Sequence, residues 1–144
     1  MVEGTFSASA DLSHGYLPYG TGLYRKHFTL PAATSAALAA GSHVAYIEFD
    51  GAQTSTDVYV NGVLLGKHAS GYTPFLFRME QAHLSQAASV GEVLLAAKVD
   101  ATKPDGWWYD GGGLYRHVRL VVVRAFPLSR PSQQLLPRLW SRQP

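Results

Sequence analysis

With 144 residues, 47% of them hydrophobic and 15% charged, the chain is long enough for one folded domain and too apolar for a disordered one. Residues 1–123 hold 8 lysines and arginines against 10 acidic residues, a net charge of −2, and residues 124–144 add four arginines and no acid. The overall charge of +2 therefore comes from the tail, which argues against nucleic-acid binding by the folded part.

Other protein classes are excluded by what the sequence lacks. Without cysteine there is no disulfide, zinc–thiolate site or thiol nucleophile. The N-terminus lacks the features of a signal peptide, and the longest apolar run, Leu120 to Val123, is too short to cross a membrane. These observations do not indicate a cellular compartment.

Short strands separated by turn residues account for most of the chain. Seven are predicted, at residues 22–30, 43–49, 56–60, 63–67, 75–79, 93–99 and 114–124. The clearest local signal is Asn61-Gly62, which predicts a type I′ turn and a tight hairpin. Residues 32–42 are interpreted as an alanine-rich connection, and residues 80–89 have room for one helical turn.

This succession of short strands and turns predicts an all-β fold, an antiparallel β-sandwich or jelly roll. The Val/Leu-rich run of residues 118–123 favours a central position for the last strand. We expect the sandwich to span residues 1–124. Residues 125–144, rich in proline and arginine, form a tail that we expect to be disordered because proline interrupts both strands and helices.

Three segments, in order, resemble the N-terminal sugar-binding domain of family 2 glycoside hydrolases, most closely its β-galactosidase-like members. They are HGYLPYGTGLYRKHFTLP (14–31), FDGAQTSTDVYVNGVLLGKHASGYTPF (49–75) and GEVLLAAKVDATKPDGWWYDGGGLYRHVRL (91–120). The resemblance implies a galactose-binding-like jelly roll. The chain is short at its N-terminus relative to the family, and Val93 replaces the asparagine that commonly follows Gly-Glu.

The resemblance also implies a role in hydrolysis of O-glycosyl compounds. Retaining glycosidases use two carboxylates about 5 Å apart, and no Asn-Glu pair of the kind that the family places at its acid/base position occurs here. We therefore expect no catalytic residues in this chain. We expect the chain to be a fragment or truncated product of a family 2 enzyme, and to help shape the sugar pocket in the whole enzyme. One expected partner is carbohydrate, bound weakly or only together with the rest of the enzyme. The expected protein partner is a catalytic barrel domain or a second copy of the chain.

Two alternatives stay open. The sandwich could serve as a protein-interaction module without sugar binding, since a short N-terminus would expose a sheet edge. An active glycosidase in its own right is a third, less favoured reading.

The candidate sugar-binding residues lie mainly in one aromatic, glycine-rich segment. Trp107, Trp108 and Tyr109 offer rings that stack on a pyranose, Asp110 accepts hydrogen bonds from hydroxyls, and the glycines that follow allow close approach. The alternative is that the rings plug the end of the sandwich and the carboxylate stabilises a turn. Gln53 is a further candidate through the resemblance, although a plain loop amide is the simpler interpretation.

Other chemistry is not supported. The six histidines have neither His-x-His nor His-x₃-His spacing, so no metal site or cofactor is predicted, and Gly-x-Ser-x-Gly and P-loop motifs are missing. The resemblance makes Asp57 structural. Arg116 is expected to pair inside the sandwich with Asp50 or Asp57.

Overall fold

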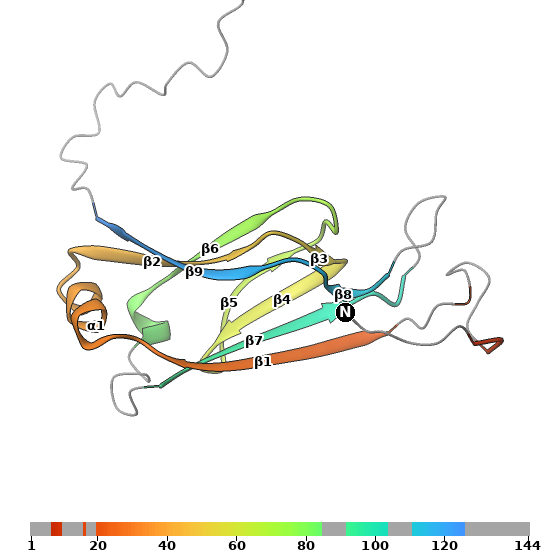
Figure 1. The fold of residues 1–144 in the computed structure, drawn as a ribbon, viewed down its shortest axis with the longest axis horizontal. Coiled ribbons are helices and arrows are strands. Elements are labelled where there is room, and N and C mark those ends of the chain that lie inside the picture. Colours follow the sequence, from red (N-terminus) through yellow and green to blue (C-terminus); the bar gives the residue numbers. More distant parts are fainter. Residues whose placement is uncertain (1–6, 10–15, 17–19, 85–91, 104–110, 126–144) are drawn as a thin grey trace, which may run out of the picture.

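Two antiparallel sheets face each other in a computed structural model that describes residues 7–9, 16, 20–84, 92–103 and 111–125 (Figure 1). The elements in chain order are β1 (Thr21–Thr29), α1 (Ala32–Ala39), β2 (His43–Phe49), β3 (Ala52–Gln53), β4 (Ser55–Val60), β5 (Val63–His68), β6 (Phe75–Met79), β7 (Glu92–Asp100), β8 (Gly113–Leu114) and β9 (Val118–Arg124). The predicted all-β sandwich is confirmed.

Each sheet is built from antiparallel neighbours. One sheet has the order β1-β7-β4-β5, the other the order β6-β2-β9, and the short strands β3 and β8 pair separately. The seven predicted strands are all present, except that the last divides into β8 and β9. Residues 81–84 are helical, within the segment where one turn was predicted.

The core lies between the two sheets and follows the alternation of the strands. In β2 the buried residues are Ala45, Ile47 and Phe49, two positions apart, as expected for a strand with one face turned inward. The fully buried Val58, Val60, Val93 and Val99 face them from the other sheet. Burial of this apolar surface is what holds the layers together.

The hairpin between β4 and β5 turns at the predicted pair. Asn61 has φ 50° and Gly62 has φ 81°, the left-handed values that a type I′ turn requires and that these two residue types tolerate best. The prediction of a tight hairpin at this position is confirmed.

Helix α1 was interpreted from the sequence as a connection. It is alanine-rich, which favours a helix, but only Leu38 is buried, so there was no apolar periodicity to reveal it. The helix ends in a Schellman arrangement: Gly41 has φ 69°, and the Ser42 N–H donates to the Ala37 carbonyl at 3.1 Å.

The prediction that the last strand is central is wrong. Among the described residues β9 pairs with β2 alone and so forms an edge of its sheet. The central strand is β2, between β6 and β9. A run of valine and leucine can also belong to an edge strand, and Leu120 and Val123 are indeed 37% and 43% exposed.

Beyond the sandwich, the expected disorder of the tail stays a prediction, because residues 126–144 lie outside the described part of the chain. No helix within that described part is long and apolar enough to cross a bilayer.

Candidate functional site

Gln53 lies at one end of the sandwich, in β3, where the chain enters β4. It pairs with Gly113 of β8, and Gly113 follows Asp110 by three residues in the sequence. Trp107, Trp108, Tyr109 and Asp110 themselves lie outside the described residues. The topology therefore brings Gln53 beside the strand into which the predicted aromatic segment leads.

The Gln53 side chain is enclosed. It is 5% exposed, and its carboxamide lies against the backbone of Gly71, where any side chain would collide with it. Its Nε2 is buried and has no hydrogen-bond partner among the described residues. Nearly all buried donors in proteins are paired. The Gln53 amide is therefore an unpaired hydrogen-bond donor at the end of the sandwich.

Tyr115 fixes the loop that covers Gln53. Its hydroxyl donates to the Gly71 carbonyl at 2.7 Å, and its ring lies so close to Gly51 that a side chain there would collide with it. Arg116 extends over the Tyr115 ring, with its Cζ 5.3 Å from the ring centroid. The contact between Tyr115 and Gly71 has no local sequence signal, since the two residues are 44 positions apart.

The expected pairing of Arg116 with Asp50 or Asp57 is wrong. Asp50 instead accepts a hydrogen bond from Arg119 Nη1 at 2.6 Å, and Asp57 pairs with Lys67 at 2.9 Å. Both acids lie at the surface rather than inside the sandwich, because a charge is much less costly where water reaches it. The hydrogen bond from Arg119 holds the pKa of Asp50 below its ordinary value, and the charges of His117 and Arg116 act in the same direction.

A cavity of about 710 Å³ lies beside these groups. Its lining is formed by Asp50, Pro74, Leu114, Tyr115, Arg116 and His117. The mixture of a carboxylate, a guanidinium, an imidazole and an aromatic ring suits a polar ligand with an apolar face, and the described lining contains a single carboxylate.

The last described residues after β7, Ala101 to Lys103, begin with an ordered turn. Thr102 donates to Asp100 Oδ1 from its backbone N–H at 3.0 Å and from its hydroxyl at 2.7 Å. These two bonds lower the pKa of Asp100. Asp100 also ends β7 next to the backbone N–H of Thr54, so this turn lies at the same end of the sandwich as Gln53.

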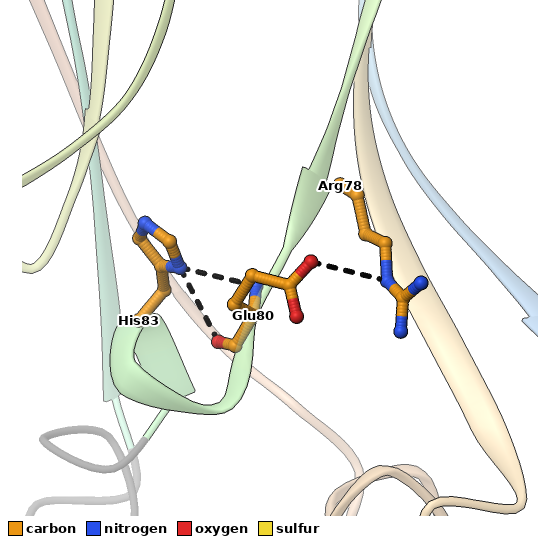
Figure 2. Close-up of polar contacts among 3 residues, drawn as sticks. All are labelled: Arg78, Glu80 and His83. Atoms are coloured by element: carbon orange, nitrogen blue, oxygen red, sulfur yellow. Dashed lines mark hydrogen bonds and ion pairs between the residues drawn. The ribbon is translucent and has the colours of Figure 1, made fainter.

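The opposite end holds the one buried histidine of the described residues, His83 (Figure 2). Its Nδ1 lies 3.0 Å from the backbone nitrogen of Glu80 and 3.3 Å from its carbonyl oxygen. Since a backbone N–H can only donate, Nδ1 accepts the shorter bond, and the hydrogen sits on Nε2, which is 3.3 Å from the Leu64 carbonyl. Glu80 also pairs with Arg78 at 3.3 Å, on the surface.

Asn61 completes this network. Its Oδ1 accepts from the Leu94 N–H and its Nδ2 donates to the His83 carbonyl, both at 2.8 Å. The buried histidine therefore serves the fold by joining a helical turn to the hairpin and to β7. No group of three metal-ligating side chains was found among the described residues.

Comparison with curated proteins gives relatives of one enzyme class. The chain is 35% identical over 122 residues to "Beta-galactosidase BoGH2A" of Bacteroides ovatus, a match that covers 83% of the chain and 13% of that protein. It is 33% identical over 140 residues to a "Beta-glucuronidase" of Formosa agariphila, covering 84% of the chain and again 13% of the relative. The chain thus spans about an eighth of these proteins. No protein-family model matches it.

Solved structures agree. A β-glycosidase from Bacteroides vulgatus superposes with a TM-score of 0.66 at 34% identity, over 84% of this chain and 14% of that one. A glycosyl hydrolase family 2 member from Bacteroides cellulosilyticus gives 0.67 at 31% identity, over 83% and 14%. In these much longer relatives, the matched part is a single domain. The chain is a homologue of the N-terminal β-sandwich domain of family 2 glycoside hydrolases.

Proposed function

We propose that this domain contributes binding groups, and no catalytic groups, to a carbohydrate pocket of a family 2 glycoside hydrolase. The groups would be Gln53 and the segment of Trp107, Trp108, Tyr109 and Asp110. In the whole enzyme the domain would help to shape the pocket in which an O-glycosidic bond is hydrolysed. The printed names of the relatives, β-galactosidase and β-glucuronidase, make galactosides and glucuronides the first sugars to test.

The orphaned Nε2 of Gln53 carries this proposal. A buried, unpaired amide donor costs about 1–3 kcal/mol, and sugars present many hydroxyl oxygens that can accept from it. The pairing of Gln53 with Gly113 supports the same location, because it brings the amide next to the chain that follows Asp110. Carbohydrate sites combine such polar groups with aromatic rings, and the sequence supplies three rings immediately before Asp110.

The test is a titration of the ¹⁵N-labelled chain with methyl β-D-galactoside and methyl β-D-glucuronide, followed by NMR. We expect the side-chain amide signals of Gln53 and the indole signals of Trp107 or Trp108 to shift, with a dissociation constant in the millimolar range. Gln53→Met and Asp110→Asn should each weaken the binding by about tenfold, the value of one or two lost hydrogen bonds.

Gln81→Met is the matched control, because Gln81 is an exposed glutamine in the helical turn at the other end of the sandwich. It should bind sugar as the unmodified chain does. An acceptor for Gln53 could also come from residues 104–110 of the chain itself. In that case the Gln53 signals would stay in place at the highest sugar concentration, and the proposal would be wrong.

A further inference from the structure

One side of the sandwich is bounded by two terminal strands. Strand β1 ends the order β1-β7-β4-β5, and β9 ends the order β6-β2-β9. A cavity of about 410 Å³ lies between them and reaches the core at Ile47 and Phe49. Neither strand has a further neighbour among the described residues, and no described strand closes the two layers on this side.

The backbone of β9 offers unused hydrogen-bonding groups along this side. The ladder between β2 and β9 runs without a register shift from Phe49↔Val118 to His43↔Arg124. Just beyond its two ends, Asp50 N donates to His117 O at 3.0 Å and Ala125 N donates to Ser42 O at 2.8 Å. Bonded pairs alternate in an antiparallel ladder, so the odd-numbered residues of β9 bond to β2. The even-numbered residues, 118 to 124, direct their N–H and C=O groups away from it.

Two of the same residues, Val118 and Leu120, contribute side chains to one wall of the cavity. Val118 and Val122 pack against the core, and Leu120, which lies between them on the same face, lines the cavity while remaining 37% exposed. A strand added at β9 would therefore find hydrogen-bond partners and an apolar wall at the same positions.

The facing wall comes from β1 and carries one buried hydroxyl without a partner among the described residues and one exposed lysine. Tyr24 and Phe28 pack against the core, and Lys26, between them on the same face, also lines the cavity. The Tyr24 hydroxyl is buried and has no hydrogen-bond partner among the described residues. Lys26 is exposed, so a carboxylate of a partner can reach its ammonium, whereas the buried Tyr24 hydroxyl is the group that lacks a hydrogen-bond partner.

The charged side chains that line the cavity are all basic, although two acidic side chains lie beside one of them. The charged residues of the cavity lining are Arg25, Lys26 and Arg119. Arg119 is paired with Asp50 at 2.6 Å and lies 3.7 Å from Glu48. In the described part of the chain no acidic side chain forms an ion pair with Arg25 or Lys26, although residues 1–123 as a whole are net negative.

We propose that β9 accepts an extended segment of another polypeptide as an added strand of its sheet. Alternate side chains of this segment are bulky and apolar and fill the cavity, and one carboxylate among them pairs with Lys26. Strand addition of this kind draws its affinity from main-chain hydrogen bonds and its specificity from pockets for alternate side chains. A second copy is a poorer fit than an acidic strand, since it would bring the same cations of β1 together. The proposal is independent of sugar binding at the Gln53 end.

The experiment measures binding of a fluorescein-labelled peptide, STVTETFTS, by fluorescence anisotropy. Its valine, glutamate and phenylalanine alternate on one face. The control peptide, STVTKTFTS, differs only in the central charge. We expect saturable binding of the first peptide and binding about fivefold weaker for the second, the scale of one partly exposed ion pair.

Two variants locate the site. Leu120→Pro removes an N–H that points away from β2, which an edge strand tolerates, and should weaken peptide binding by at least about tenfold through the lost bond and the blocked approach. Lys26→Glu should reverse the preference between the two peptides. Lys98→Glu, an exposed lysine outside the cavity lining, is the matched control and should leave the preference unchanged.

The outcomes are decisive in each direction. Circular dichroism shows whether the Leu120→Pro variant folds. If this variant does not fold, the peptide preference of Lys26→Glu alone tests the proposal. The proposal is overturned by the absence of saturable binding, by an unchanged preference in Lys26→Glu, or by full binding to folded Leu120→Pro. Sedimentation velocity measures the oligomeric state of the chain alone. A dimer that dissociates in the Leu120→Pro variant would show that a second copy binds at β9, and this would also overturn the proposal.

Discussion

The two ends of strand β4 differ in whether the polar side chains near them have hydrogen-bond partners. At the hairpin end, Asn61 and His83 are each held by hydrogen bonds to the backbone of neighbouring elements, and both side chains are satisfied. At the other end, the Nε2 of Gln53 and the hydroxyl of Thr56 are buried without a partner among the described residues. Gln53, Thr56 and His83 are all buried, so the two ends differ in how their buried polar atoms are paired.

This contrast separates structure from function within one small domain. A satisfied polar cluster stabilises one conformation and leaves nothing to offer a ligand. An unsatisfied donor lowers stability and is retained where something else completes it. The comparison predicts that substitutions at the hairpin end reduce stability, whereas a substitution of Gln53 raises stability and weakens ligand binding.

The largest expected effect is at Asn61. Asn61→Ala should lower the free energy of unfolding by about 3 kcal/mol, because alanine tolerates the left-handed conformation poorly and the Leu94 N–H loses its acceptor. Urea denaturation followed by tryptophan fluorescence measures this. Asn61→Asp keeps the acceptor and should cost only about 1 kcal/mol; equal losses in the two variants would show that the side-chain bond to Leu94 contributes little.

A smaller loss is expected at His83. His83→Leu keeps an apolar side chain of similar size but leaves the N–H of Glu80 without its acceptor, so unfolding should become easier by about 2 kcal/mol. Denaturation under the same conditions measures the loss. A variant as stable as the unmodified chain would place this histidine among the groups that serve binding rather than the fold.

The opposite sign is expected at Gln53. Gln53→Met removes an unpaired amide from an enclosed position and should raise the free energy of unfolding by about 1 kcal/mol. The same denaturation measurement serves, without sugar present. If the variant is less stable than the unmodified chain, the amide has a partner and the contrast between the two ends is lost.

The smallest effect is at Asp50 and depends on pH. Folding lowers the pKa of Asp50 through Arg119, so the stabilisation is complete above the ordinary pKa of 3.8 and is lost as the pH falls through the lower value of the folded state. Asp50→Asn should therefore reduce the melting temperature slightly at neutral pH, and by progressively less as the pH falls below 3.8. Calorimetry at several pH values tests this, and a pH-independent difference would contradict the assignment.

The sequence was sufficient for features that depend on local pattern. Alternation and turn residues predicted the strands, and Asn61-Gly62 predicted the hairpin. Helix α1 could not be found in this way, because a run of alanines has no apolar periodicity. The edge position of β9 and the pairing of Arg119 with Asp50 depend on which strands become neighbours, and that is decided by the fold as a whole.

The candidate site was predicted in part. Gln53 was named from the family resemblance, and the structure adds that its amide is enclosed by Gly71 and unpaired. Neither property has a sequence signal, since both arise from residues far apart in the chain. The roles predicted for Trp107, Trp108, Tyr109 and Asp110 remain predictions.

The bonds made by Asn61 also bear on how the protein ages. An asparagine followed by glycine is the pair most prone to spontaneous deamidation, which begins when the next backbone nitrogen attacks the carboxamide. Here both atoms of that carboxamide are held, by the Leu94 N–H and the His83 carbonyl, so the folded chain should deamidate at Asn61 much more slowly than the unfolded one. Mass spectrometry of samples stored with and without denaturant would show a slow gain of mass at this site in the unfolded sample alone.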